Sequence, residues 1–149
     1  MILANGRLPI VVAAVLLLGA CANAESTDQS DPVVQEMNEL SVPAGATPWA
    51  PCKYSARSAS QRLYSCLYNA NLSFAELLAA YNKELLANGW RKAETEKLRD
   101  WGRDLGGEDV TFCKGNVQLN LQFAGKRAQY GWQYAIATSV GVPPYICSG

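Results

Sequence analysis

Apolar residues recur every three or four positions between residues 74 and 85, which is the spacing of one face of an α-helix. The positions are Phe74, Leu77, Leu78, Tyr81 and Leu85. Ser73 and Glu76 form the sequence of a capping box at the start of this stretch. Gly89 can take the left-handed backbone conformation that ends many helices. The pattern therefore predicts a helix over residues 74–88.

Strict alternation of apolar and polar residues predicts β-strands in other parts of the chain. The alternating or short apolar stretches are residues 61–68, 109–113, 117–123 and 129–140. Gly115 predicts a bend between the second and third of these strands, and residues 124–127 join the last two into a hairpin.

Residues 91–108 are ambiguous. Leu98, Trp101 and Leu105 have helical spacing, whereas residues 90–97 could form a strand that runs back beside the first one. We expect a short strand followed by a helical turn that ends at Gly106-Gly107.

This order of elements predicts an α+β fold in which one main helix packs on a small, mainly antiparallel sheet that disulfides stabilise. We assign this globular domain to residues 46–149. Upstream, Asp31-Pro32 could cap and start a short helix, with Val33, Met37 and Leu40 on one face.

The first 20 residues have the three parts of a secretory signal. Arg7 precedes an apolar run from Leu8 to Leu18, and two small residues follow. The run is shorter than the roughly 20 residues that cross a bilayer, which argues against an uncleaved membrane span.

Leu18-Gly19-Ala20-Cys21 resembles a lipobox, the processing signal of bacterial lipoproteins. The resemblance implies that residues 1–20 are removed and that Cys21 becomes an acylated N-terminus bound to membrane lipid. The alternative is an ordinary secretory signal cut after Ala22-Asn23-Ala24. By the same resemblance, Ala22 after the cysteine implies the outer membrane, facing the periplasm, in a Gram-negative cell, and the outer face of the single membrane in a Gram-positive one.

The end of the predicted helix, Ala80-Tyr81 through Asn88-Gly89-Trp90, is also similar to a helix ending of small bacterial envelope lipoproteins. This similarity covers about a dozen residues and implies no activity.

Five cysteines become an even set of four once Cys21 is assigned to lipid. The other four are Cys52, Cys66, Cys113 and Cys147. In an exported protein such a set indicates two disulfides, for which three pairings exist. We favour Cys52–Cys66 and Cys113–Cys147. A four-thiolate metal site is the alternative, but it usually needs two closely spaced pairs, which are absent here.

The chain carries 13 basic and 13 acidic residues, with five acids and no base in residues 21–40. We therefore predict that residues 21–45 form an acidic flexible tether with a possible short helix. Residues 41–149 have only a small, scattered basic excess, which excludes a dense nucleic-acid-binding stripe.

The chain contains no histidine, which removes the commonest general base and most catalytic metal sites. Four carboxylates cluster around Gly106-Gly107 and could bind a hard cation, but we favour a charged surface loop, because Arg99 and Arg103 are interleaved with them. The four carboxylates are Asp100, Asp104, Glu108 and Asp109. We expect no enzyme activity, no metal and no cofactor, with a carboxylate-based hydrolase as the weakest alternative.

Tyr130, Trp132 and Tyr134 stand at alternate positions and would share one sheet face. Either this face is the core beneath the helix, or it is an exposed aromatic surface for a partner. We therefore expect a membrane-anchored lipoprotein that acts as a non-catalytic binding or assembly protein, with an envelope protein or a cell-wall component as partner. The alternative is a ligand-binding or immunity-type inhibitor module.

Overall fold

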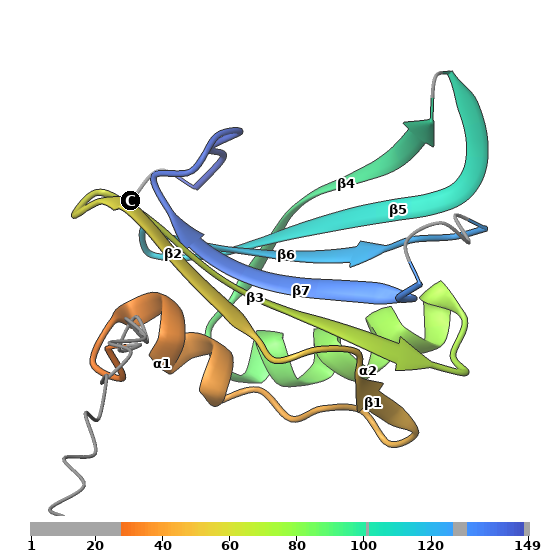
Figure 1. Ribbon diagram of the computed structural model, residues 1–149, viewed down its shortest axis with the longest axis horizontal. Helices are drawn as coiled ribbons and strands as arrows, with labels where there is room; N and C mark the ends of the chain where they lie inside the picture. Colours follow the sequence, from red (N-terminus) through yellow and green to blue (C-terminus); the bar gives the residue numbers. More distant parts are fainter. Residues whose placement is uncertain (1–27, 101, 127–130, 148–149) are drawn as a thin grey trace, which may run out of the picture.

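One antiparallel sheet of seven strands dominates the computed structural model, which describes residues 28–100, 102–126 and 131–147. Along the chain the elements are α1 (Pro32–Asn38), β1 (Ala46–Pro48), β2 (Lys53–Ser58), β3 (Gln61–Ala70), α2 (Phe74–Ala87), β4 (Arg91–Asp100), β5 (Arg103–Lys114), β6 (Val117–Phe123) and β7 (Tyr134–Val140). The strand order is β1-β3-β7-β6-β5-β4, and β2 also pairs with β3. Both helices lie on the same side of the sheet (Figure 1).

The predicted fold class, one main helix on a small sheet, is wrong. The sheet is the larger part of the molecule, and the helices are two short elements that cover it. Strands β1 and β2 escaped prediction because they are short edge strands whose side chains are mostly exposed. An exposed edge strand needs no apolar alternation, so its sequence carries little signal.

The described residues of the range 91–108 contain no helical turn. They include β4 and the first half of β5, and the two strands pair as a long hairpin. Leu98 lies opposite Gly107, but the next residue of β4, Arg99, lies opposite Asp104. Residues 105–106 of β5 are therefore extra and form a bulge between these pairs. Gly106 sits in the bulge with a φ of 73°. The two glycines therefore shape a strand rather than end a helix.

The best-specified element, α2, begins and ends as its sequence predicts. Ser73 and Glu76 form the complete capping box. At the other end the amide of Gly89 donates to the carbonyl of Leu86, and the amide of Trp90 donates to that of Leu85. With Gly89 at a φ of 84°, these two bonds make a Schellman ending.

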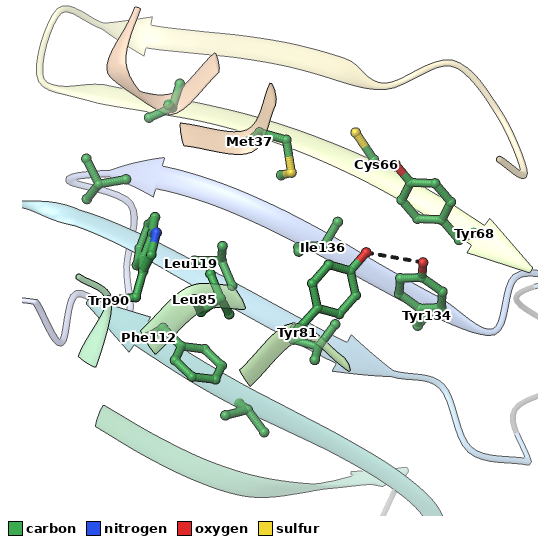
Figure 2. Close-up of a cluster of buried hydrophobic side chains, with 14 of the residues drawn as sticks. Met37, Cys66, Tyr68, Tyr81, Leu85, Trp90, Phe112, Leu119, Tyr134 and Ile136 are labelled. Carbon is green, nitrogen blue, oxygen red and sulfur yellow. Dashed lines mark hydrogen bonds between the residues drawn. The ribbon is translucent and has the colours of Figure 1, made fainter. Parts of the chain in front are cut away.

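The core lies between the helices and the sheet. Leu77, Tyr81 and Leu85 of α2 are buried against side chains of the central strands. These partners include Tyr68, Phe112, Leu119, Tyr134 and Ile136, as Figure 2 shows. Burying a large apolar side chain contributes roughly 1.5–3 kcal/mol, so this layer is the main source of stability.

The N-terminal helix α1 packs on the same sheet face, with Val33, Val34 and Met37 buried. It begins where its sequence predicts, because the carboxylate of Asp31 accepts from the amide of Val33 and Pro32 follows. This helix falls inside the segment predicted as a tether, so the described part of that segment includes a packed element.

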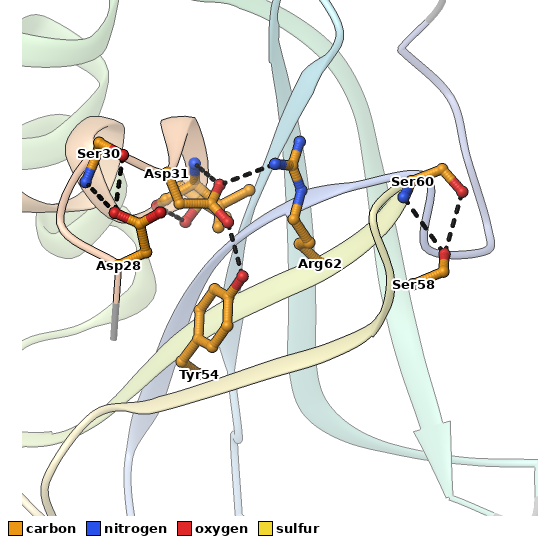
Figure 3. A network of polar contacts seen from close by, with 9 residues as sticks. Asp28, Ser30, Asp31, Tyr54, Ser58, Ser60 and Arg62 are labelled. Atoms are coloured by element: carbon orange, nitrogen blue, oxygen red, sulfur yellow. Dashed lines mark hydrogen bonds and ion pairs between the residues drawn. The ribbon is translucent and has the colours of Figure 1, made fainter. Parts of the chain in front are cut away.

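A buried carboxylate fastens α1 to the sheet (Figure 3). Asp31 is only 6% exposed, and it accepts a hydrogen bond of 2.7 Å from the Tyr54 hydroxyl of β2. The guanidinium of Arg62 in β3 lies 3.5 Å from the same carboxylate. Because one side chain caps the helix and binds two strands, α1 has a defined position on the sheet.

Candidate functional site

The sheet face opposite the helices is polar, and its centre is hollowed into a groove of about 310 Å³. Glu94 and Glu96 of β4, Asp109 and Thr111 of β5, and Gln118 and Asn120 of β6 line it, together with Leu63, Ser139, Val142, Pro143, Pro144 and Ile146. Hereafter, "the groove" means this hollow.

A bulge in β4 places two carboxylates on this face. Lys92 lies opposite Phe112, but Glu94 lies opposite Thr111, so Ala93 is the extra residue. Directly opposed residues in an antiparallel pair point to the same face. Phe112 is in the core, so without the bulge Glu94 and Glu96 would point away from the groove.

The C-terminal tail forms the other wall of the groove. The disulfide between Cys113 and Cys147 fastens it to β5. The side chain of Gln118 donates to the carbonyl of Pro144 at 3.2 Å and accepts from the amide of Ile146 at 3.0 Å. A disulfide and two hydrogen bonds of Gln118 therefore hold the tail against the sheet.

An amide network crosses the floor of the groove. Gln118 donates to the side-chain oxygen of Asn120 at 2.9 Å. Asn120 in turn donates to Asp109 and to the hydroxyl of Thr111, both at 3.0 Å. The network connects the tail to the carboxylates and orients the Asn120 amide without ambiguity.

The carboxylates of the groove repel one another. The charge of Glu96 raises the pKa of Glu94 above its usual value, with partial burial adding to the effect. Burial raises the pKa of Asp109, and the hydrogen bond from Asn120 acts in the opposite direction. The ion pairs formed among residues 28–100, 102–126 and 131–147 include none of these three carboxylates.

A second hollow of about 330 Å³ adjoins the groove and shares Leu63, Val142 and Pro143 with it. Its other lining residues are Ser55, Arg57 and Gln61. The tail therefore separates a carboxylate-rich hollow from one that contains a cationic side chain.

The structure divides the predicted aromatic surface. Tyr134 is fully buried, and its ring stacks on that of Tyr68 at a centroid distance of 5.0 Å. The rings of Tyr134 and Tyr81 pack in an edge-to-face arrangement. Trp132 is half-buried and precedes β7, whereas Tyr130 lies outside the described residues. Of the two alternatives for this face, the core beneath the helices applies to Tyr134, because its side of the strand is the one that the helices cover.

The predicted cluster of four carboxylates is also divided. The carboxylate of Asp104 accepts a hydrogen bond of 2.9 Å from the amide of Gly106 and lies 3.6 Å from the ammonium of Lys97. Both interactions lower the pKa of Asp104, and the hydrogen bond has the larger effect. Asp109 lies in the groove, whereas Glu108 is on the opposite sheet face. In the part of the chain that the structure describes, no three His, Cys, Asp or Glu side chains are close enough to hold a metal ion.

The four predicted disulfide cysteines pair as favoured, Cys52 with Cys66 and Cys113 with Cys147. The first joins β3 to the residue before β2, and the second fastens the C-terminal tail to β5. Cys21 lies outside the described residues.

Sequence reasoning missed the groove, although it considered Asp109. The available signal was that Glu94, Glu96, Thr111 and Asn120 are polar residues at alternate positions. Only the pairing of residues 91–100 with β5, and the bulge at Ala93, bring them to one face.

No protein-family model, curated protein or solved structure matches this chain. Neither of the helices among the described residues is long and apolar enough to cross a membrane.

Proposed function

We propose that this protein is an exported lipoprotein that Cys21 anchors to a membrane, and that its domain acts by binding, as a non-catalytic accessory or assembly protein of the cell envelope. The observation that carries the proposal is the pairing of cysteines. Two disulfides use Cys52, Cys66, Cys113 and Cys147, so Cys21 alone is left over in the sequence. Disulfides of this kind persist in oxidising compartments, where a lipidated N-terminus also belongs.

The distance between the anchor and the domain supports a role close to the membrane. Asp31 is fixed to the sheet, and it lies ten positions after Cys21 in the sequence. Ten residues span at most about 35 Å. An acylated Cys21 would therefore keep the α1 end of the domain within that distance of the bilayer surface. The tip of the β4–β5 hairpin lies at the end of the molecule far from α1 (Figure 1).

The groove supports binding over catalysis. It combines hydrogen-bonding amides and carboxylates with apolar side chains, which is the composition of a small ligand site. The chain contains no histidine, so the groove lacks the commonest general base.

Fractionation of the native host tests the anchor. We expect the wild-type protein in the membrane fraction with a mass that corresponds to cleavage before Cys21 plus acyl chains. Cys21→Ser should move it to the soluble extracytoplasmic fraction, whereas Thr27→Ser in the same segment should leave it in the membrane. Wild-type protein with an unmodified N-terminus would overturn the proposal.

Crosslinking in intact cells followed by capture tests the binding role. An accessory protein should recover resident envelope proteins or cell-wall fragments with the wild type and lose them when Cys21→Ser releases it. Recovery of a foreign toxic enzyme would instead identify an immunity-type inhibitor.

A further inference from the structure

We infer that the groove binds an ammonium or guanidinium group carried on an apolar stem. This inference rests on the proposed binding function and names the chemistry of the ligand. The same chemistry occurs in the Lys and Arg side chains of peptides and in free diamines, so the source of the group is a separate question that the experiment below resolves.

Charge is the first reason. Glu94, Glu96 and Asp109 meet on one face because Glu96 lies opposite Asp109 and Glu94 is two residues away along β4. Elsewhere on the molecule, acidic side chains do have cationic partners, since Glu36 pairs with Lys114 and Asp104 pairs with Lys97. A cation in the groove would relieve the mutual repulsion of the three carboxylates.

The Ser139 hydroxyl is the second reason. Ser139 of β7 is 4% exposed and lines the groove, and its side chain has no hydrogen-bond partner in the described parts of the chain. Its oxygen remains accessible from the groove, because the only buried side-chain nitrogen or oxygen without a partner among the described residues is the Nε of Arg62. An N–H group of a bound cation would donate to this oxygen, while the carboxylates accept from its other hydrogens.

The apolar wall is the third reason. Leu63, Val142 and Pro143 lie beside the polar residues, and Ile146 is 39% exposed at the rim. A groove of about 310 Å³ is at the small end of ligand sites, so it suits one side chain or a short diamine rather than a large molecule. A bare metal ion would leave this apolar wall unused, and the three carboxylates do not form a coordination group.

Calorimetric titration of the purified full chain in detergent tests the inference with matched probes. The cationic probes are Nα-acetyl-lysine methylamide, Nα-acetyl-arginine methylamide and cadaverine. The uncharged control is Nα-acetyl-norleucine methylamide, which has the shape of the lysine probe without its ammonium. We expect a lysine or arginine probe to bind at least about tenfold more tightly than the norleucine probe, because the carboxylates contribute only to a charged ligand.

Variants then assign the binding to the groove. Glu94→Gln/Glu96→Gln should weaken binding about tenfold or more, and Ser139→Ala should weaken it several-fold. Glu108→Gln is the matched control, because it removes one carboxylate from β5 on the opposite sheet face and should change the Kd less than about twofold. Urea unfolding of each variant checks that the fold is retained, and the glutamine variants remove repulsion, so we expect them to be as stable as wild type.

The comparison among cationic probes identifies the source of the group. Tighter binding of the two amino-acid probes indicates a peptide side chain, and tighter binding of cadaverine indicates a free diamine. Equal binding of the norleucine and lysine probes, or full binding by Glu94→Gln/Glu96→Gln, would overturn the inference. Absence of any binding would also overturn it while leaving the proposed function intact, provided that the crosslinking experiment still recovers an envelope partner.

Discussion

Two buried polar groups show how single residues organise this molecule. Asp31 joins α1 to β2 and β3 through three different contacts. Tyr81 and Tyr134 place their hydroxyls 3.3 Å apart inside the core. In both cases a polar group is buried with a specific partner, which makes it costly to remove either partner alone.

Asp31→Ala should lower the free energy of unfolding by about 2–3 kcal/mol, because it removes the helix cap and leaves the Tyr54 hydroxyl and Arg62 without their acceptor. Asp31→Asn keeps an oxygen for the cap but loses the ion pair, so its effect should be smaller. Urea unfolding measures both variants. Asp28→Ala, at an exposed turn, should cost less than about 0.5 kcal/mol, and a loss as large as that of Asp31→Ala would contradict the assigned role.

The tyrosine pair predicts a loss of stability at alkaline pH. Burial raises the pKa of Tyr134 to about 12, and burial followed by the hydrogen bond with Tyr134 raises that of Tyr81 further. An unfolded tyrosine has a pKa of about 10. Above pH 10 the unfolded state releases these protons while the folded state retains them, so stability falls as pH rises from about 10 to beyond 12.

Unfolding at a series of pH values tests this effect. Tyr134→Phe should reduce the slope of stability against pH above pH 10, whereas Tyr145→Phe, at an exposed position, should not change it. An unchanged slope in Tyr134→Phe would show that the buried tyrosine is not responsible.

Among the secondary-structure elements, the limits of α2 are set by capping interactions at its ends, whereas the course of β4 is set by its pairing with β5. The Ser73 hydroxyl accepts from the Glu76 amide at 3.3 Å, while the Glu76 carboxylate accepts from the Ser73 amide at 2.8 Å. The strand β4 has no such local stop signals, and its course is set by its pairing with β5. This contrast explains why one element was predicted well and the other was not.

Ser73→Ala should lower stability by about 1 kcal/mol through loss of the cap. It should also bring the pKa of Glu76 back toward its usual value, because the hydrogen bond from the Ser73 side chain is the main cause of its lowered pKa. Thermal unfolding and an NMR titration of Glu76 measure the two effects. Ser73→Thr retains the hydroxyl, so it should preserve most of both, and a Thr variant as unstable as the Ala variant would argue against the capping role.

The molecule as a whole has two unequal faces. Helices cover one side of the sheet with an apolar core, whereas a short disulfide-bonded tail covers part of the other and leaves the groove open. Opening the tail would therefore affect the groove far more than the core.

Cys113→Ser/Cys147→Ser should lower the free energy of unfolding by about 3–4 kcal/mol, since the disulfide closes a loop with a sequence separation of 34. Hydrogen exchange should increase first at the Ile146 amide, which donates to Gln118. Unfolding measurements and exchange mass spectrometry check both results. Cys52→Ser/Cys66→Ser, at the far edge of the sheet, should leave exchange at Ile146 unchanged.

The sequence by itself determined the features that depend on near neighbours. The capped helix α2, the start of α1, strand β6 and the turn before it all follow from residues within a few positions of one another. The disulfide pairing was also predictable as a preference, because four cysteines allow only three pairings.

Only the tertiary structure decided the size of the sheet, the burial of Tyr134 and the existence of the groove. Helical spacing at Leu98 and Leu105 was misleading, because pairing with β5 outweighs a weak local preference. The physical reason is that strand register and a one-residue bulge at Ala93 choose the face of every side chain that follows. That choice is made by contacts between segments far apart in the chain.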